Sequence, residues 1–125
     1  ALLRALSRLE HSNIKLQFIG NTCPELKQEI QRLNLGNKVI LKPYMPHIAS
    51  IAELQQSDLL LLVINQVANG KGIVPGKIFE YLGTRKPILC LGDPTGEAGE
   101  IIKTTNSGKK FSLYCHVFPQ VFYLA

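Results

Sequence analysis

The apolar run at residues 58–64 constrains the fold of this chain most, because it is apolar at successive rather than alternate positions. This pattern is typical of a parallel strand that is covered on both faces. Further short apolar runs span 16–20, 38–41, 87–91 and 110–115, with helical periodicity between them. Strands that alternate with helices predict an α/β fold, a Rossmann-like, doubly wound parallel sheet with helices on both faces. The run at 58–64 should lie inside it.

Helix boundaries are predicted from capping patterns. Thr22 and Glu25 have the spacing of a capping box at the start of one helix, and Gly36 is predicted to end it. Ser50 and Glu53 repeat that spacing ahead of a short helix. The remaining helices are expected at about residues 2–9, at 75–84, where Pro75 starts the first turn and Gly83 is near the end, and at 97–105.

In such a sheet, ligands bind at the carboxyl ends of the strands. The loops that follow the predicted strands are 20–23, 42–47, 65–76 and 92–96. We therefore look for a binding site in these loops.

At 125 residues the chain has the size of one domain, and 46% hydrophobic against 18% charged residues indicates a globular protein. No apolar run approaches the roughly 18 residues that span a bilayer. The first residues resemble an amphipathic helix rather than a secretion leader, and three widely spaced cysteines form no disulfide framework. We expect a soluble, cytoplasmic protein, with the inner face of the membrane as a second location.

The net charge of +5 favours anionic ligands but does not choose among them. The basic residues are scattered, without the basic and aromatic stripe of a nucleic-acid surface, so no nucleic-acid partner is expected. His11, His47 and His116 have no carboxylates at metal-ligand spacing. We therefore expect no metal site and no cofactor.

The loop at 65–77 is rich in glycine and ends at a helix start, which suits a phosphate. It is not a Walker A loop, because Lys71 stands where the first glycine is required and Ile78 replaces the Ser or Thr. It is not the GxGxxG motif of dinucleotide-binding proteins either. Gly70 and Gly72 follow a loop rather than a strand, and the third glycine of that motif is missing.

Lys77 and Glu80 are three residues apart and share one helix face. Lys77 can balance phosphate charge, while the Glu80 carboxylate can accept hydrogen bonds from both hydroxyls of a ribose. The alternative is an ordinary ion pair on a solvent-exposed helix. Spacing alone leaves both interpretations open.

Residues 75–89, PGKIFEYLGTRKPIL, resemble the PxKxxEYLAxGKPVL signature of retaining, family-four-like bacterial glycosyltransferases. Residues 44–47, YMPH, and 57–62, SDLLLL, resemble the YxPH and ADxLLL segments of that family, and 92–102, GDPTGEAGEII, resembles its GDPxGEAAxII turn and helix. The similarity covers residues 1–112, which we interpret as part of the C-terminal, nucleotide-sugar-binding domain of a GT-B fold.

The resemblance implies that a nucleotide-diphosphate sugar, such as a UDP- or GDP-sugar, binds here and that its sugar is transferred to an acceptor in glycan or cell-surface polysaccharide synthesis. Glu80 is implied to bind the ribose, and Pro75, Gly76 and Lys77 to lie near the diphosphate. The implied base region contains Tyr44, Pro46 and His47, and the implied cleft also contains Gly20 and Asn21. Catalytic residues are not assigned, and the acceptor would bind mainly to a separate N-terminal domain.

The chain departs from the family at three places. Gly72 stands where many relatives have the first acid of an ExxxxxxxE pair. The first strand of the family domain, with its glycine loop and basic residue, has no counterpart, so we expect a fragment that is inactive alone and lacks its central strand. The apolar tail, 113–125, is either a shifted reading of the gene or a segment that packs into the place of that strand.

Two other functions are compatible with the sequence. One is a non-catalytic α/β nucleotide-binding module. A module that resembles a response-regulator receiver domain is disfavoured, because no acidic pair ends the first strand. The other is a GT-B UDP-sugar epimerase, for which the chain has no acid cluster.

Overall fold

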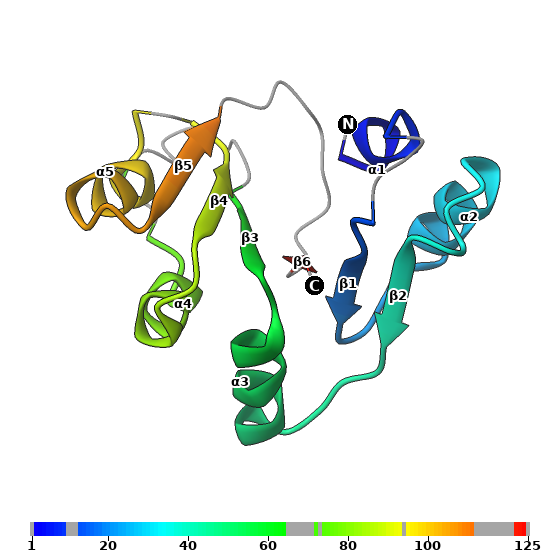
Figure 1. The fold of residues 1–125 in the computed structure, drawn as a ribbon, viewed down its shortest axis with the longest axis horizontal. Coiled ribbons are helices and arrows are strands. Elements are labelled where there is room, and N and C mark those ends of the chain that lie inside the picture. Colours follow the sequence, from blue (N-terminus) through cyan, green and yellow to red (C-terminus); the bar gives the residue numbers. More distant parts are fainter. Residues whose placement is uncertain are drawn as a thin grey trace.

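The computed structural model describes residues 2–9, 13–64, 72, 74–93, 95–111 and 122–124. Helices and strands alternate along the chain up to β5 (Figure 1). The elements are α1 (Leu2–Ser7), β1 (Leu16–Ile19), α2 (Pro24–Arg32), β2 (Val39–Lys42), α3 (His47–Gln56), β3 (Leu59–Val63), α4 (Lys77–Thr84), β4 (Ile88–Leu91), α5 (Glu97–Thr104), β5 (Gly108–Phe111) and β6 (Phe122–Leu124).

The sheet has the strand order β2-β1-β6-β3-β4-β5. β1 pairs with β2 in parallel, and β3, β4 and β5 form a second parallel group. The α/β prediction with parallel strands is confirmed, and the architecture is compatible with a Rossmann-like fold. β3 lies inside the sheet, between β6 and β4, as its continuous apolar run predicts.

β6 joins the two parallel groups in the middle of the sheet (Figure 1). It is antiparallel to both neighbours, with Tyr123 paired to Gln17 of β1 and to Leu60 of β3. The end of the apolar tail therefore lies in the centre of the sheet, as the second interpretation of that tail requires. Among the described strands, no other one contacts both groups.

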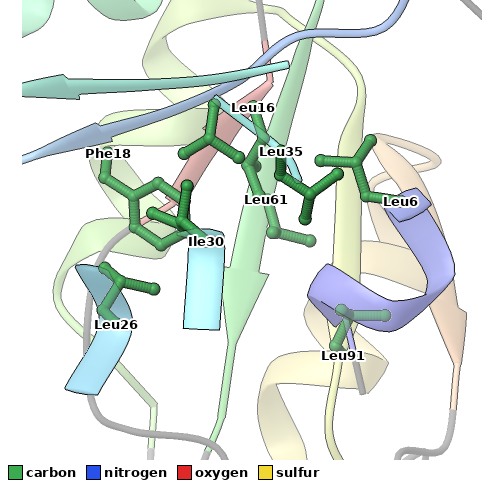
Figure 2. Close-up of a cluster of buried hydrophobic side chains, with 9 residues drawn as sticks. Leu6, Leu16, Phe18, Leu26, Ile30, Leu35, Leu61 and Leu91 are labelled. Atoms are coloured by element: carbon green, nitrogen blue, oxygen red, sulfur yellow. The ribbon is translucent and has the colours of Figure 1, made fainter. Parts of the chain in front are cut away.

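The alternation of side chains along β3 builds a core on each face of the sheet. Leu61 belongs to a cluster with Leu6 of α1 and Ile30 of α2 (Figure 2). Leu60 and Leu62 belong to the opposite cluster, which contains side chains of α3, α4 and α5. Successive strand residues point to opposite faces, so helices cover both faces of the sheet. The second cluster includes Leu54, Ile78, Tyr81 and Ile102, all fully buried.

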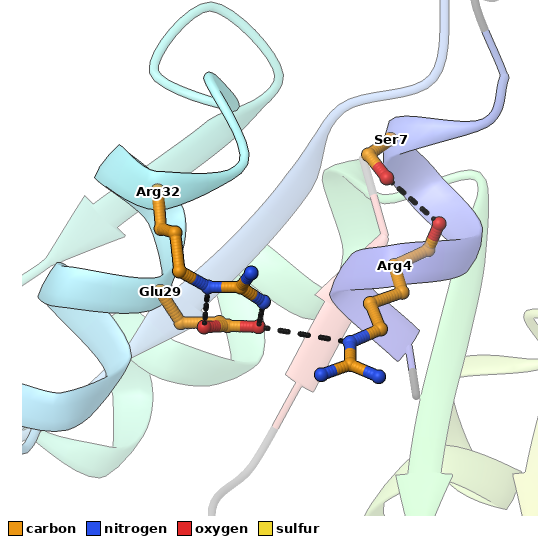
Figure 3. A network of polar contacts seen from close by, with 4 residues as sticks. All are labelled: Arg4, Ser7, Glu29 and Arg32. Atoms are coloured by element: carbon orange, nitrogen blue, oxygen red, sulfur yellow. Dashed lines mark hydrogen bonds and ion pairs between the residues drawn. The ribbon is translucent and has the colours of Figure 1, made fainter.

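A surface network adds a polar link between α1 and α2 (Figure 3). Glu29 accepts hydrogen bonds of 2.7 and 2.5 Å from Arg32 Nε and Nη2, and Arg4 Nε lies 4.0 Å from Glu29 Oε1. The hydrogen bond from Arg32 lowers the pKa of Glu29. Because these groups are exposed, the apolar cluster rather than the ion pairs holds α1 in place.

The predicted capping box of α2 is wrong. The N-cap residue is Cys23, which makes no side-chain cap bond, and the helix begins at Pro24. Pro lacks an N–H, so one of the amide groups that a cap would satisfy is absent here. The helix also ends before Gly36, at Arg32, and Asn34 follows it in the left-handed region, with φ 54°.

The predicted cap at Ser50 is wrong as well, because α3 begins earlier, at His47. The Ser50 amide already donates to Pro46 O, and its hydroxyl donates to His47 O at 2.7 Å. Glu53 contacts other residues, described below. α4 begins two residues after the predicted start, with Gly76 as N-cap. It ends at Thr84, as predicted, with Gly83 near its end and Arg85 as a left-handed C-cap.

β5 begins at Gly108, before the predicted residue 110, and the predicted residues 112–115 lie outside the described part. A Cβ atom on Gly108 would lie 1.8 Å from Ile88 O. The glycine therefore lets β5 start in close contact with β4. The described helices include none with the length and apolarity to cross a membrane.

Candidate functional site

The candidate site lies at the edge of the sheet where the parallel strands β1 to β4 end. The loops after these strands lead to the first turns of α2, α3, α4 and α5. Ligands of open α/β sheets bind at this edge. The predicted site residues all belong to these loops and first turns.

His47 and Glu80 come together at this edge. His47 is the first residue of α3, and Glu80 lies in the first turn of α4. His47 Nε2 lies 3.1 Å from Glu80 Oε1, within hydrogen-bond distance. The His47 side chain is 70% exposed and that of Glu80 is 35% exposed, so both are accessible to a ligand.

Lys77 stands one turn before Glu80, at the start of α4. Burial lowers the pKa of Lys77, and the nearby Glu80 carboxylate opposes this shift. A partly desolvated ammonium group is hydrated less than an ordinary surface lysine, so it gains more from an anionic ligand. Lys77 and Glu80 both belong to α4, three residues apart.

The start of α4 differs from the phosphate cradle that the glycine-rich loop predicts. The Ile78 amide donates to Pro75 O at 3.0 Å, and the Phe79 amide donates to Gly76 O at 3.2 Å. These two amides are therefore used within the turn rather than pointing outward. The predicted phosphate loop itself, residues 65–71 and 73, lies outside the described residues.

The other predicted residues line the same edge at different strands. Gly20 follows β1 with φ 120°, a conformation that favours glycine, and its amide donates to Lys42 O at 3.1 Å. Asn21 follows it and is exposed. β6 separates β1 from β3 in the sheet, so Gly20 and Asn21 stand two sheet positions from β3.

Tyr44 and Pro46 lie between β2 and α3. Tyr44 is 75% exposed, and Pro46 is the N-cap residue of α3. Pro46 thus precedes His47 directly, while Tyr44 extends toward solvent. The structure brings His47 together with Glu80, and it leaves Tyr44 as a ring that a ligand can cover.

Sequence reasoning missed a polar network beneath α3. Glu53 Oε2 accepts hydrogen bonds from Lys42 Nζ at 2.7 Å and from Gln17 Nε2 at 3.0 Å. These bonds, the one from Lys42 first, lower the pKa of Glu53. The network ties α3, and thereby His47, to β1 and β2. Its signal in the sequence is Gln17, an amide within an otherwise apolar strand that needs a buried partner.

The described part of the chain contains no group of three or more His, Cys, Asp or Glu side chains arranged to hold a metal ion. His11, Cys115 and His116 lie outside it. Cys23 and Cys90 are free thiols, and burial raises the pKa of Cys90 to about 11. Cys90 is therefore a core residue rather than a nucleophile.

Comparisons with protein-family models, with curated proteins and with solved structures found no match to this chain.

Proposed function

We propose that this chain is the nucleotide-sugar-binding part of a retaining GT-B glycosyltransferase, acting in the cytoplasm on a UDP- or GDP-sugar. The observation that carries the proposal is the contact of 3.1 Å between His47 and Glu80. These residues come from two separate segments that resemble the family, and the resemblance assigns them to neighbouring parts of one nucleotide.

The chemistry of Glu80 fits a ribose diol. An ionised carboxylate accepts hydrogen bonds through both oxygens, and the His47 contact involves Oε1. His47 can thus hold the carboxylate in one orientation while Glu80 accepts from the ribose hydroxyls. The exposed ring of Tyr44 and the imidazole of His47 offer flat faces for the base.

Lys77 fits the diphosphate. It shares the first turn of α4 with Glu80, so a nucleotide whose ribose contacts Glu80 brings its phosphates toward the start of that helix. The ammonium group of Lys77 stabilises negative charge there. In a sugar transfer the diphosphate leaves as an anion, so this stabilisation lowers the barrier as well as binding the donor.

The sheet topology supports the same proposal. A GT-B domain without its first strand lacks the central strand that would lie between two parallel groups of strands. In this chain β6 stands between such groups, in the antiparallel direction. We interpret it as a substitute for the central strand, which keeps the edge with His47 and Glu80 assembled.

Calorimetric titration of the whole chain with UDP, GDP and their sugars tests the proposal. We expect saturable binding, and Glu80→Gln should weaken it about tenfold, as loss of a charged hydrogen bond does. Asp58→Asn is the control, since Asp58 is an exposed acid just before β3, at the opposite edge of the sheet. Absence of binding, or equal affinity of the Glu80 variant, contradicts the proposal.

A further inference from the structure

A hollow region lies at the edge of the sheet opposite the candidate site, where β4 and β5 begin and where α4 and α5 end. One hollow, of about 530 Å³, is lined by Arg85, Lys86, Thr105, Asn106 and Ser107, over the apolar side chains of Leu82 and Pro87. An adjoining hollow, of about 440 Å³, shares Asn106 and adds Lys103, Lys109 and Lys110. None of these residues belongs to the proposed donor site.

The charge of this region is strongly positive. Lys110 bonds to Glu100 at 2.7 Å, and Lys103 also interacts with Glu100. Arg85, Lys86 and Lys109 have no carboxylate partner within the described part of the chain. The two hollows together contain five basic side chains. The dipoles at the ends of α4 and α5 contribute about one negative charge, and Glu100 contributes another, so about three positive charges remain unbalanced. Dipole compensation alone therefore does not account for the cluster.

The backbone of Arg85, which lines this hollow, has an unusual conformation. Arg85 is the C-cap of α4 in the left-handed region, with φ 58°, where glycine is favoured. An arginine there costs about 1 kcal/mol of backbone strain, and its exposed side chain offsets little of this by packing. Asn106, on the other side of the hollow, is also left-handed, with φ 51°. Asparagine adopts this conformation readily, so the strain concerns Arg85 alone.

The donors of the hollow specify the class of ligand. The hydroxyls of Thr105 and Ser107 bond to each other at 2.8 Å, and Thr105 also donates to Ile101 O. The other polar side chains of the lining, Arg85, Lys86 and Asn106, all carry N–H donors. A planar guanidinium beside an ammonium matches the oxygens of a phosphate group.

We propose that this hollow binds the phosphate group of a phosphoester, carried either by a soluble metabolite or by a lipid headgroup. The lining contains no aromatic ring on which a base could stack, which disfavours single-stranded nucleic acid. The volume suits a headgroup-sized ligand, and Leu82 and Pro87 provide an apolar floor for its carbon atoms.

The test is an NMR titration of the isotope-labelled whole chain with glycerol 3-phosphate and with inorganic phosphate, against potassium chloride of equal ionic strength. In parallel, the chain is sedimented with phosphatidylglycerol vesicles and with phosphatidylcholine vesicles. We expect saturable shifts at the amides of Lys86, Asn106 and Ser107, or sedimentation that depends on phosphatidylglycerol. The first result identifies a soluble phosphoester, and the second a lipid headgroup.

The variant Arg85→Gln with Lys86→Gln should weaken this binding about tenfold or more. Lys15→Gln with Lys27→Gln removes the same charge from exposed positions elsewhere and should leave it almost unchanged. Arg85→Gly removes the strain, so it should raise the melting temperature and still weaken binding, which separates loss of binding from loss of folding. Absence of both shifts and sedimentation, or equal weakening by the control pair, overturns the proposal.

Discussion

His47 Nε2 and Glu80 Oε1 lie 3.1 Å apart, although 33 positions separate the two residues in the sequence. The contact joins the first turn of α3 to the first turn of α4. Both side chains are partly or largely exposed, and an exposed pair contributes little to stability. Its importance therefore lies in the geometry that it gives to Glu80.

The first prediction concerns His47→Ala. We expect the free energy of unfolding to change by less than about 1 kcal/mol, because the pair is exposed. We also expect weaker nucleotide binding, because Glu80 loses the group that orients it. Urea denaturation and calorimetry measure the two effects. A large loss of stability, or an unchanged affinity, would show that the contact has a different role.

Glu53 should make stability depend on pH. Its pKa is lowered from the ordinary value of 4.5 by the hydrogen bonds from Lys42 and then Gln17. The unfolded chain binds this proton more readily, so the contribution is present above pH 4.5 and disappears as pH falls through the lower, native pKa. Glu53→Gln should therefore destabilise the protein by about 1 kcal/mol near neutral pH and by less in acid.

Denaturation curves of the two proteins across this pH range measure the difference. Glu25→Gln serves as the control, because Glu25 is exposed. A difference between Glu53→Gln and the parent chain that stays constant down to low pH would contradict the assignment.

β6 should be essential for the cooperativity of the sheet. Tyr123 pairs with Gln17 on one side and with Leu60 on the other, and these pairings join the two parallel groups. Proline at this position removes an amide donor from the centre of the sheet, so Tyr123→Pro should cost about 2 kcal/mol or more. Tyr123→Ala keeps the amide and should cost less. Thermal unfolding compares them, and equal stability of the proline variant and the parent chain would exclude the central position of β6.

Cys90 should be almost inert toward alkylation. Its pKa of about 11 leaves roughly one thiolate in a thousand at pH 8, and its side chain is buried in the core. Cys23 is less buried and should react faster with iodoacetamide, as peptide mapping by mass spectrometry will show. Rapid modification of Cys90 in the native protein would mean that the core cluster opens readily.

The sequence predicts the elements of this fold better than their ends. The strands β1 to β4 lie within one residue of their apolar runs, because burial on both faces dictates those runs. The caps were wrong because several local bonds compete at a helix start. Pro24 shifts the start of α2, and the amide of Ser50 is already bonded to Pro46. Such competition depends on backbone geometry that spacing does not contain.

The candidate site is predictable as a set of loops, but not as a set of contacts. The resemblance names both His47 and Glu80, yet their contact depends on how α3 and α4 pack. The role of Glu53 also depends on three-dimensional neighbours, since Lys42 and Gln17 lie on two other elements. The antiparallel direction of β6 follows from long-range pairing that no local pattern encodes.

The most direct test of the account measures the coupling between Glu80 and a ribose. The nucleoside diphosphate that binds most tightly is titrated beside its 2′,3′-dideoxy form, with the parent chain and with Glu80→Gln. Loss of the diol should weaken binding to the parent chain about tenfold and change binding to the variant little. An equal loss with both proteins would contradict the claim that Glu80 binds the ribose.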